Sequence, residues 1–270
     1  MRQCVVNNLV IGGNAPIRLM GVINCSPESF YSDSYIPADT VRVKAVEMME
    51  QGADFIDIGA RSTAPNVQAI SVSEEALRME AALAQMDGSG IPVSVDTMHQ
   101  GVLEVCLRHD IHAVNDISGL SSPAYARLVA DSGLPAFLMA SNYQPGDAVG
   151  LARTIETLGT VVGRCESYGI QEYVLDPGIG LWTALRSPEH DWELCRNFEQ
   201  FLAFGRPLLA AVSRKSFIGN LINREPVDRL AGSLAVTVML LQKGACVVRA
   251  HDIPQTSDAI RVFQHMEGKQ

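Results

Sequence analysis

Short apolar runs alternate with amphipathic segments along most of the chain. The runs are nearly continuous in hydrophobicity, which is typical of parallel strands that are buried on both faces. Most of them follow closely on a glycine that ends the preceding helical segment, where the backbone can take a positive φ. The pattern predicts strands at 18–23, 55–59, 92–96, 113–117, 136–139, 173–176, 208–212 and 246–249.

The segments between these runs carry signals for helices. Ser71-Val-Ser-Glu74 has the spacing of a capping box, and Ser122-Pro123 has the form of an N-cap followed by proline at the first helical position. Pro226 is expected to begin a helix that runs to Gly244. After the capping box, apolar residues recur at helical spacing at positions 72, 76, 79, 83 and 86.

Strands that alternate with helices fit either an open doubly wound sheet or a closed barrel. Eight nearly equal units in a chain of 270 residues favour the α/β class with a (β/α)8 TIM barrel. Residues 4–11 predict an additional short N-terminal β-hairpin that covers the floor of the barrel. Since no linker or low-complexity run interrupts the pattern, we expect a single domain over residues 1–270.

Composition and charge narrow the classes of function. The net charge is -9 and the sequence contains no basic run, which argues against nucleic acid as a partner. No apolar stretch approaches the roughly 20 residues needed to cross a membrane. The 6 cysteines are scattered and form no CxxC pair, so we expect reduced thiols in a cytoplasmic protein.

Polar residues stand where the predicted strands end. In a β/α barrel the chemistry lies at the carboxyl ends of the strands, so these residues are the candidate site. We expect some of the aspartates, Asp57, Asp116 and Asp252 among them, to serve either a ligand or a loop. The candidates at the strand ends are Asn24, Asp57, Asp96, Asn115, Asp116, Met139, Asp176, Lys215, Arg249, His251 and Asp252.

The mixture of these residues indicates two kinds of ligand chemistry. Asp96, Asn115 and Asp176 together suit a flat heterocycle that is rich in N–H donors and ring acceptors. The cations suit an anionic leaving group such as a phosphate. These cations are Arg249, His251, Lys215 and, as a further candidate, Arg214.

Two segments at the first two predicted strands carry a family resemblance: MGVINCSPESF at 20–30 and GADFIDIG at 52–59. They are similar to the signatures of the first and second strands of the dihydropteroate synthases, so the sequence resembles this family. Any one such motif is weak evidence, but several in the same order over nearly the whole chain are specific. The remaining motifs lie at 62–63, 94–97, 115–118, 176–180, 213–219 and 249–252.

The resemblance implies an activity and a set of roles. Members of this family join 6-hydroxymethyl-7,8-dihydropterin diphosphate to p-aminobenzoate and release pyrophosphate in folate biosynthesis, with Mg²⁺ as cofactor and a homodimer as the usual assembly. By position, Lys215, Arg249 and His251 are the expected catalytic residues, and Asn24 is expected to help hold Mg²⁺ and the diphosphate. The pterin would contact Asp96, Asn115, Met139, Asp176 and Lys215, and the amine and diphosphate side would include Thr63, Ser216, Arg249 and His251.

The chain departs from the family pattern on the side of the second substrate. Ala64 stands where an arginine is usual, and Ala140 stands where a histidine is usual. Leu181-Trp182-Thr183 replaces the usual aromatic–Gly–Lys sequence, and the first loop reads Ser32-Asp-Ser-Tyr35. The pterin half is intact, so we expect either an ordinary p-aminobenzoate site with altered loops or a site for a different arylamine.

Two other functions fit the same barrel. One is a pterin-dependent methyltransferase that passes a methyl group to a corrinoid protein, although such an enzyme has no use for the cations at 213–216 and 249–252. The other is a catalytically weakened homologue that binds the pterin without releasing pyrophosphate, for which Ala64 is the motivating residue.

Overall fold

The computed structural model describes residues 2–27, 35–62 and 70–268. A parallel sheet runs in the order β8-β7-β6-β5-β4-β3-β10-β9, and a bridge between Leu175 and Leu208 joins its two ends, so that the sheet closes into a barrel. Its strands are β3 (Arg18–Asn24), β4 (Phe55–Gly59), β5 (Val93–Asp96), β6 (Ala113–Asp116), β7 (Ala136–Met139), β8 (Tyr173–Asp176), β9 (Leu209–Ala210) and β10 (Val247–Ala250).

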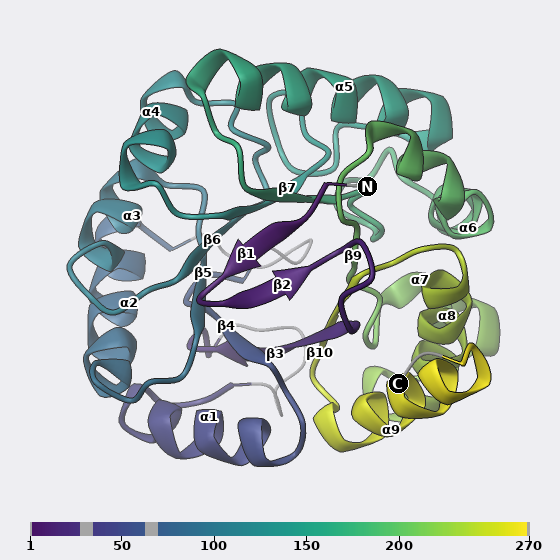
Figure 1. Cartoon of the computed structure of the whole chain (residues 1–270), viewed down its shortest axis with the longest axis horizontal. Helices are drawn as coiled ribbons and strands as arrows, with labels where there is room; N and C mark the ends of the chain where they lie inside the picture. Colours follow the sequence, from purple (N-terminus) through teal and green to yellow (C-terminus); the bar gives the residue numbers. More distant parts are fainter. Residues whose placement is uncertain (1, 28–34, 63–69, 269–270) are drawn as a thin grey trace.

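Helices surround this barrel on the outside (Figure 1). Short 3-10 helices, η2 (Ala38–Thr40), η3 (Phe198–Phe204) and η4 (Pro226–Asp228), join or extend them. The α-helices are α1 (Val41–Glu50), α2 (Val72–Met86), α3 (Gln100–Cys106), α4 (Pro123–Ser132), α5 (Gly150–Tyr168), α6 (Pro188–Arg196), α7 (Ser216–Ile222), α8 (Leu230–Gln242) and α9 (Ile253–Met266).

The predicted barrel is confirmed, and the local signals hold with a few corrections. Ser122 caps α4 by accepting a hydrogen bond from the N–H of Tyr125, and Gly133 ends that helix with φ 66°. The helix expected from Pro226 to Gly244 is instead divided into η4 and α8, because the backbone leaves helical geometry at Arg229, whose side chain turns inward to bond backbone carbonyls.

The buried face predicted for α2 is wrong at the first turn of the helix. Val72 is 41% exposed, whereas Glu75 is 1% exposed and shares the buried face with Met79 and Leu83. Glu75 precedes Met79 by four residues, so the helical period itself places this carboxylate on the inner face. A charged side chain that is buried there requires hydrogen-bond partners.

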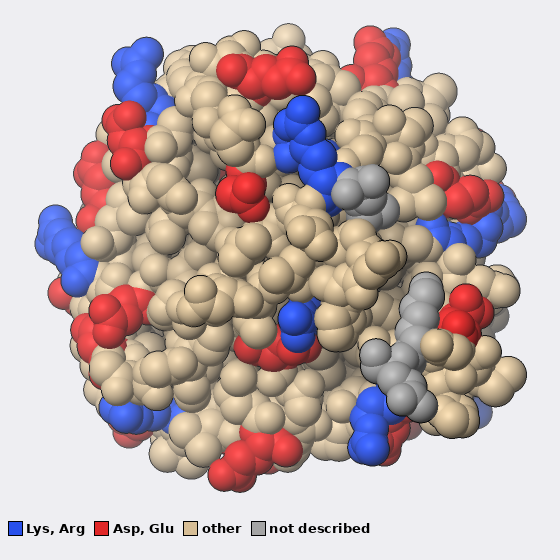
Figure 2. All heavy atoms as spheres, in the orientation of Figure 1, with Lys and Arg blue, Asp and Glu red and all other residues tan. Residues whose placement is uncertain are grey.

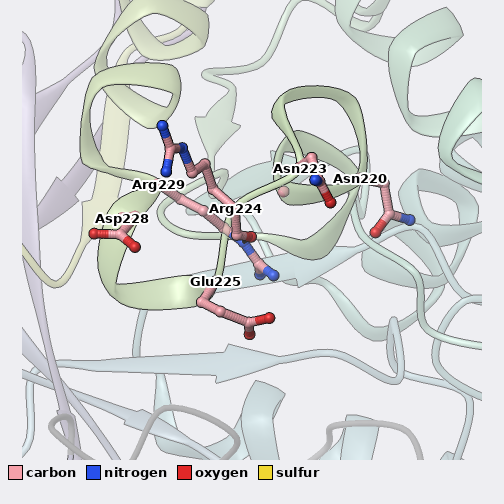
Figure 3. A pocket seen from close by; sticks show the side chains of 7 residues that line it. Asn220, Asn223, Arg224, Glu225, Asp228 and Arg229 are labelled. Atoms are coloured by element: carbon pink, nitrogen blue, oxygen red, sulfur yellow. Dashed lines mark hydrogen bonds between the residues drawn. The ribbon is translucent and has the colours of Figure 1, made fainter.

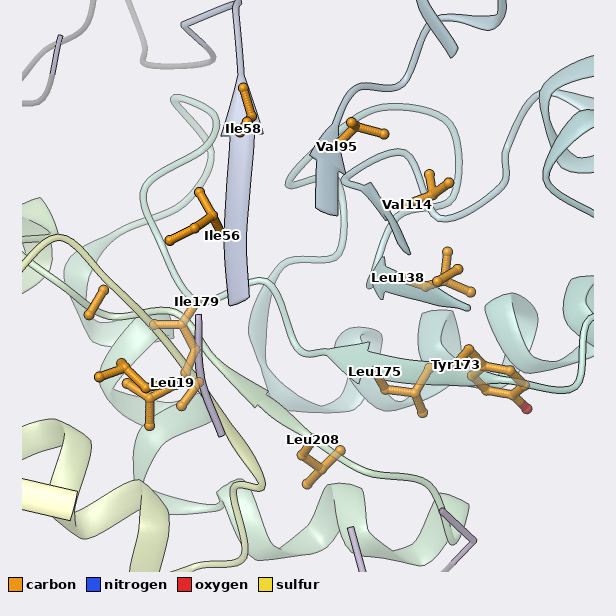
Figure 4. Packing of buried hydrophobic residues seen from close by; sticks show 14 of the residues in the cluster. Leu19, Ile56, Ile58, Val95, Val114, Leu138, Tyr173, Leu175, Ile179 and Leu208 are labelled. Carbon is orange, nitrogen blue, oxygen red and sulfur yellow. The ribbon is translucent and has the colours of Figure 1, made fainter. Parts of the chain in front are cut away.

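Two apolar layers fix the barrel. Side chains on successive strand residues point to opposite faces, so one set packs outward against the helices and the other fills the interior. The outward set includes Ile56, Val95, Val114 and Leu138 (Figure 4). The inward set consists of Met20, Phe55, Ala113, Phe137, Val174, Leu209, Ala211 and Val247.

The N-terminal hairpin is present as predicted. Its strands β1 (Cys4–Val6) and β2 (Leu9–Ile11) pair antiparallel. Cys4, Val6 and Ile11 are fully buried and belong to the same apolar cluster as the inward-facing strand residues. The hairpin therefore closes the amino-terminal end of the barrel, and Figure 1 shows it lying across the ring of strands.

Charged side chains of both signs are interspersed on the face that carries the hairpin (Figure 2). Among the described residues, no helix is long and apolar enough to cross a membrane. The described cysteines, at positions 4, 25, 106, 165, 195 and 246, are all free thiols.

Truncation of a large side chain inside the barrel should lower the stability of the fold. Phe137 is fully buried and stacks on Phe55 with ring centroids 5.6 Å apart. We expect Phe137→Ala to lower the free energy of unfolding by about 3–5 kcal/mol, because it leaves a cavity in the closed barrel. Urea denaturation measures this, with Tyr143→Ala as the control, since Tyr143 is 89% exposed. Equal losses in both variants would contradict the assignment of Phe137 to the core.

Candidate active site

The candidate site begins where the inward-facing positions change from apolar to polar. Along β4 the inward residue two positions after Phe55 is Asp57, and along β10 the residue two positions after Val247 is Arg249. The same step leads from Ala113 to Asn115, from Val174 to Asp176 and from Phe137 to Met139. Because the strands are parallel and in register, these side chains meet at the carboxyl end of the barrel.

Arg249 joins two carboxylates across the barrel. Its Nε donates to Asp57 Oδ2 at 2.7 Å, and its Nη2 donates to Asp96 Oδ2 at 2.9 Å. Asn115 Nδ2 also donates to Asp57 Oδ2 at 2.9 Å. Burial opposes the charge on Arg249, but Asp57 and Asp96 outweigh it and raise the pKa of the guanidinium above its usual range. Asp96, which is expected to bind the heterocycle, is thus in direct contact with Arg249, which is expected to bind the phosphate.

Asp96 is an acceptor whose charge can change near neutral pH. Burial raises its pKa to about 7, Arg249 acts to lower the pKa, and Asp57 acts to raise it. A carboxyl group poised in this way can accept hydrogen bonds from a heterocycle when ionised and can release its proton near neutral pH. The predicted pterin contact is therefore a titratable group rather than a fixed charge.

The loops after β8 and β9 form the opposite wall. Asp176 Oδ1 accepts from the N–H of Gly178 at 2.8 Å, and its second oxygen has no hydrogen-bond donor among the residues that the structure describes. Lys215 Nζ donates to the carbonyl of Ile179 and lies over the ring of Trp182, 5.2 Å from its centroid. Trp182 is held in turn by a hydrogen bond from its Nε1 to the carbonyl of Gly178 at 2.9 Å.

Burial changes the acid–base character of this wall as well. The pKa of Lys215 is lowered to about 8, chiefly by burial, while Asp176 acts to raise it. The pKa of Asp176 is raised by burial, and Lys215 acts against this shift. A lysine with a lowered pKa keeps part of its population neutral near physiological pH, so its N–H groups and its charge can both respond to a bound ligand.

The remaining predicted residues that the structure describes lie around the same opening. Burial, followed by the charge of Arg249, lowers the pKa of His251 to about 4, and its Nδ1 is 3.1 Å from Ser213 Oγ. Asn24 ends β3, and its backbone carbonyl accepts from the N–H of Ile36 at 2.9 Å. Met139 is 1% exposed, and Ser216 is the first residue of α7. Thr63, together with Ala64, Ser32 and Asp33, lies outside the described residues.

Three further candidate residues form hydrogen bonds that hold loops in place. Arg214 is predicted as a further anion-binding cation, but its guanidinium is bound to both oxygens of Asp252 and to the carbonyls of Pro226 and Val227, so this prediction is wrong. Asp252 is accordingly the partner of Arg214. Asp116 accepts from the N–H groups of Ser118 and Leu120, both at 2.7 Å, and so stabilises the loop that follows β6.

A cluster centred on Glu75 was missed in the sequence. Arg61, Thr97 and His99 all bond its carboxylate at the outer edge of the opening, beside the ends of β4 and β5. The signal that could have found it is the helical period of α2, which places Glu75 on the same face as Met79.

A second polar hollow lies at the junction of α7 and α8 (Figure 3). Arg229 crosses it, donating from Nε to the carbonyl of Arg224 at 2.9 Å and from Nη1 to the carbonyl of Arg214 at 3.1 Å. It lies so close to Gly219 that a side-chain carbon there would meet its Nε at 2.1 Å. This arginine fixes the loop that presents Lys215. The hollow is lined by Gly219, Asn220, Asn223, Arg224, Glu225, Asp228 and Arg229.

Comparison with known proteins agrees with this geometry. A family model described as pterin binding enzyme matches residues 20–251. The dihydropteroate synthase of Escherichia coli strain K12 is 34% identical over 260 residues, covering 91% of this chain and 90% of the relative. That of Neisseria meningitidis serogroup B is 34% identical over 277 residues, covering 94% of each.

Solved structures give the same result. A dihydropteroate synthase from Coxiella burnetii in complex with pteroic acid superimposes with a TM-score of 0.88 and 26% identity over 100% of both chains. The Xanthomonas albilineans dihydropteroate synthase with 4-aminobenzoic acid has a TM-score of 0.84 and 31% identity over 98% of both chains. The fold and the polar interior define a pterin-binding enzyme built on a (β/α)8 barrel. Within that class, the chain belongs to the dihydropteroate synthase family.

The raised pKa of Asp96 makes a prediction about stability. Because the folded chain keeps this proton up to about pH 7 while the unfolded chain releases it near 3.8, the folded state binds more protons between these values. Stability contributed by Asp96 is therefore present at low pH and lost as the pH rises towards 7. We expect Asp96→Asn to become progressively more stable than the wild type over this range.

Urea denaturation between pH 5 and pH 8 measures the difference. Asp131→Asn, at an exposed position of α4, is the control, and its difference from the wild type should be nearly constant. A constant difference for Asp96→Asn as well would show that Asp96 titrates normally in the folded chain.

Proposed function

We propose that this protein condenses 6-hydroxymethyl-7,8-dihydropterin diphosphate with p-aminobenzoate or a related arylamine and releases pyrophosphate. The observation that carries the proposal is the ring of inward-facing acceptors and donors formed by Asp96, Asn115, Asp176 and Lys215 at the carboxyl end of the barrel. Its curated relatives bear the name dihydropteroate synthase, and related structures bind pteroic acid or 4-aminobenzoic acid.

The pterin is proposed to lie inside the barrel opening. Its N–H donors would bind Asp96 and Asp176, its ring acceptors would receive hydrogen bonds from Asn115 and Lys215, and Met139 would pack on its face. Asp57 is fully buried and bonds Asn115 and Arg249, so it would orient these two side chains instead of contacting the substrate. The dihydropterin can delocalise positive charge at the methylene carbon, so departure of the diphosphate can precede attack by the amine.

The diphosphate is proposed to lie towards β10 and β3. Arg249 and His251 would bind its oxygens, and the negative charge would raise the pKa of His251 from its low value in the free chain. Anionic transition-state charge is stabilised best by donors that are already oriented, and Arg249 is oriented by two carboxylates. The arylamine attacks in its neutral form, so no strong base is required.

Mg²⁺ is proposed to arrive with the diphosphate. The described residues contain no group of three or more His, Cys, Asp and Glu side chains placed to hold a metal. Mg²⁺ commonly keeps several waters and binds phosphates with only one or two protein ligands, and an amide oxygen such as that of Asn24 suits it. When bound, the ion would neutralise charge on the leaving group.

The arylamine would enter beside Thr63 and Ser216. Among the described departures from the family pattern, Trp182 lies beside Lys215, whereas Ala140 is buried in the apolar cluster between the strands and the helices. Trp182 therefore supports a second-substrate site that differs in shape from the usual one. We also propose that residues 1–270 form a single domain and that the protein is cytoplasmic. A homodimer is proposed as well, and the exposed apolar side chains Leu221, Val227 and Met239 on α7, η4 and α8 support it.

Pyrophosphate release tests the proposed reaction. We expect release from the pterin diphosphate with Mg²⁺ to require p-aminobenzoate or another arylamine, and Asp96→Ala to reduce kcat/KM by at least about 100-fold, since a charge-assisted pterin contact is lost inside the barrel. Asp131→Ala, at an exposed position of α4, should retain full activity.

The same assay separates the alternatives. A wild-type chain that binds the pterin diphosphate but releases no pyrophosphate with any arylamine would be the catalytically weakened homologue. Methyl transfer from a reduced methylpterin to a corrinoid protein would identify the methyltransferase. Turnover with other arylamines but not with p-aminobenzoate would assign the departure at Trp182 to a changed amine specificity.

A further inference from the structure

A buried carboxylate lies just outside the ring of proposed pterin contacts. Glu75, on α2, is 1% exposed. Its Oε2 accepts from Arg61 Nε at 2.5 Å and lies 3.0 Å from His99 Nδ1, while its Oε1 accepts from Thr97 Oγ1 at 2.7 Å. These partners come from the segments that follow β4 and β5, so a single side chain ties the two strand ends together.

The hydrogen bonds keep Glu75 ionised. Burial acts to raise its pKa, but the bonds from His99, Thr97 and Arg61 outweigh burial and leave the pKa below its usual range. An ionised carboxylate can only accept, so His99 Nδ1 carries the proton that it donates. With its oxygens occupied in this way, Glu75 fixes the direction of the Arg61 side chain.

Arg61 uses only part of its hydrogen-bonding capacity in this arrangement. Its Nε is bound to Glu75, whereas Nη1 and Nη2 have no partner among residues 2–27, 35–62 and 70–268. The Arg61 side chain is only 12% exposed in the ion pair. A guanidinium presents donors in a planar fork that matches carboxylate and phosphate oxygens, so a largely enclosed fork with free donors is suited to an anionic group.

Arg61 lies at the carboxyl end of the barrel, close in the chain to a strand end that packs on Asp96. Arg61 follows the end of β4 by two residues, and Gly59 at that end packs so closely on Asp96 that an added side-chain carbon would meet Asp96 Cβ at 3.3 Å. Thr97, which bonds Glu75, directly follows Asp96. The cations Lys215 and Arg249 approach from β9 and β10, so Arg61 provides a separate cation above β4.

We propose that Arg61, positioned by Glu75, is a second anion-binding residue of the site and receives an anionic oxygen group of a substrate. The inference rests on the proposed function, whose substrates carry two such groups: the diphosphate of the pterin and the acidic substituent of the arylamine. The chemistry of recognition is the same for both, a fork of N–H donors to paired oxygens. Glu75 is a positioning residue in this arrangement, and Arg61 is the residue that touches the substrate.

Arg61→Gln is the direct test, because it removes the charge and keeps a polar side chain at this position. In one arm, KM is compared for p-aminobenzoate and for p-aminobenzamide, which has the same ring without the charge. In the other, calorimetric affinity is compared for the pterin diphosphate and for the pterin alcohol. We expect about a 10- to 100-fold loss for the charged member of one pair and a change below about 2-fold for its neutral partner.

Matched variants separate a direct contact of Arg61 with the ligand from a general effect of removing one positive charge. Arg108→Gln, at an exposed position after α3, carries the same change of charge away from the opening and should leave both arms unchanged. Arg61→Lys should restore part of the lost affinity. Glu75→Gln should lower the affinity for the same charged ligand. The double variant of Glu75→Gln and Arg61→Gln should bind this ligand no more weakly than Arg61→Gln alone, because the two residues act through one contact.

The proposal is overturned if Arg61→Gln behaves like Arg108→Gln in both arms, or if charged and neutral ligands lose affinity equally. Either result differs from failure of the proposed function, in which the wild-type chain itself would release no pyrophosphate with any arylamine.

Discussion

The bridge from Arg249 to Asp57 and Asp96 is the interaction on which the rest of the site depends. Asp57 stands immediately above the apolar filling of the barrel, where an unpaired carboxylate would be costly. The positive charge of Arg249 compensates the charge of Asp57, and Asn115 donates a further hydrogen bond to the same oxygen of Asp57. The bridge therefore stabilises a layer of polar side chains inside the barrel and fixes the directions of the side chains proposed to bind the pterin.

The same bridge connects the two halves of the proposed reaction. Arg249 contacts a proposed pterin acceptor, Asp96, while also being the cation proposed for the diphosphate. Occupation of Asp96 by the pterin would compete with Arg249 Nη2 and make that donor available to the leaving group. Burial shifts the pKa of Asp96 to about 7 and that of Lys215 to about 8, so the charges around the ligand can adjust near neutral pH.

The sequence predicts the barrel and most of the site because both rest on periodic patterns. Continuous apolar runs locate the strands, and the residues at their ends locate Asp96, Asn115, Asp176 and Arg249. It does not predict which residues pair, since the bond between Arg249 and Asp57 joins positions 192 residues apart. For the same reason Arg214 could not be separated in advance from the substrate cations, because only the fold brings it to Asp252.

Binding of 6-hydroxymethyl-7,8-dihydropterin without its diphosphate tests the central claim most directly, because the ligand can use only the polar layer inside the barrel. Titration calorimetry should show one site per chain in the wild type. Asp96→Asn should lose at least about 10-fold in affinity, since a charged acceptor is replaced by a neutral amide. A wild type that fails to bind this ligand, or an Asp96→Asn variant that binds it equally well, would contradict the account.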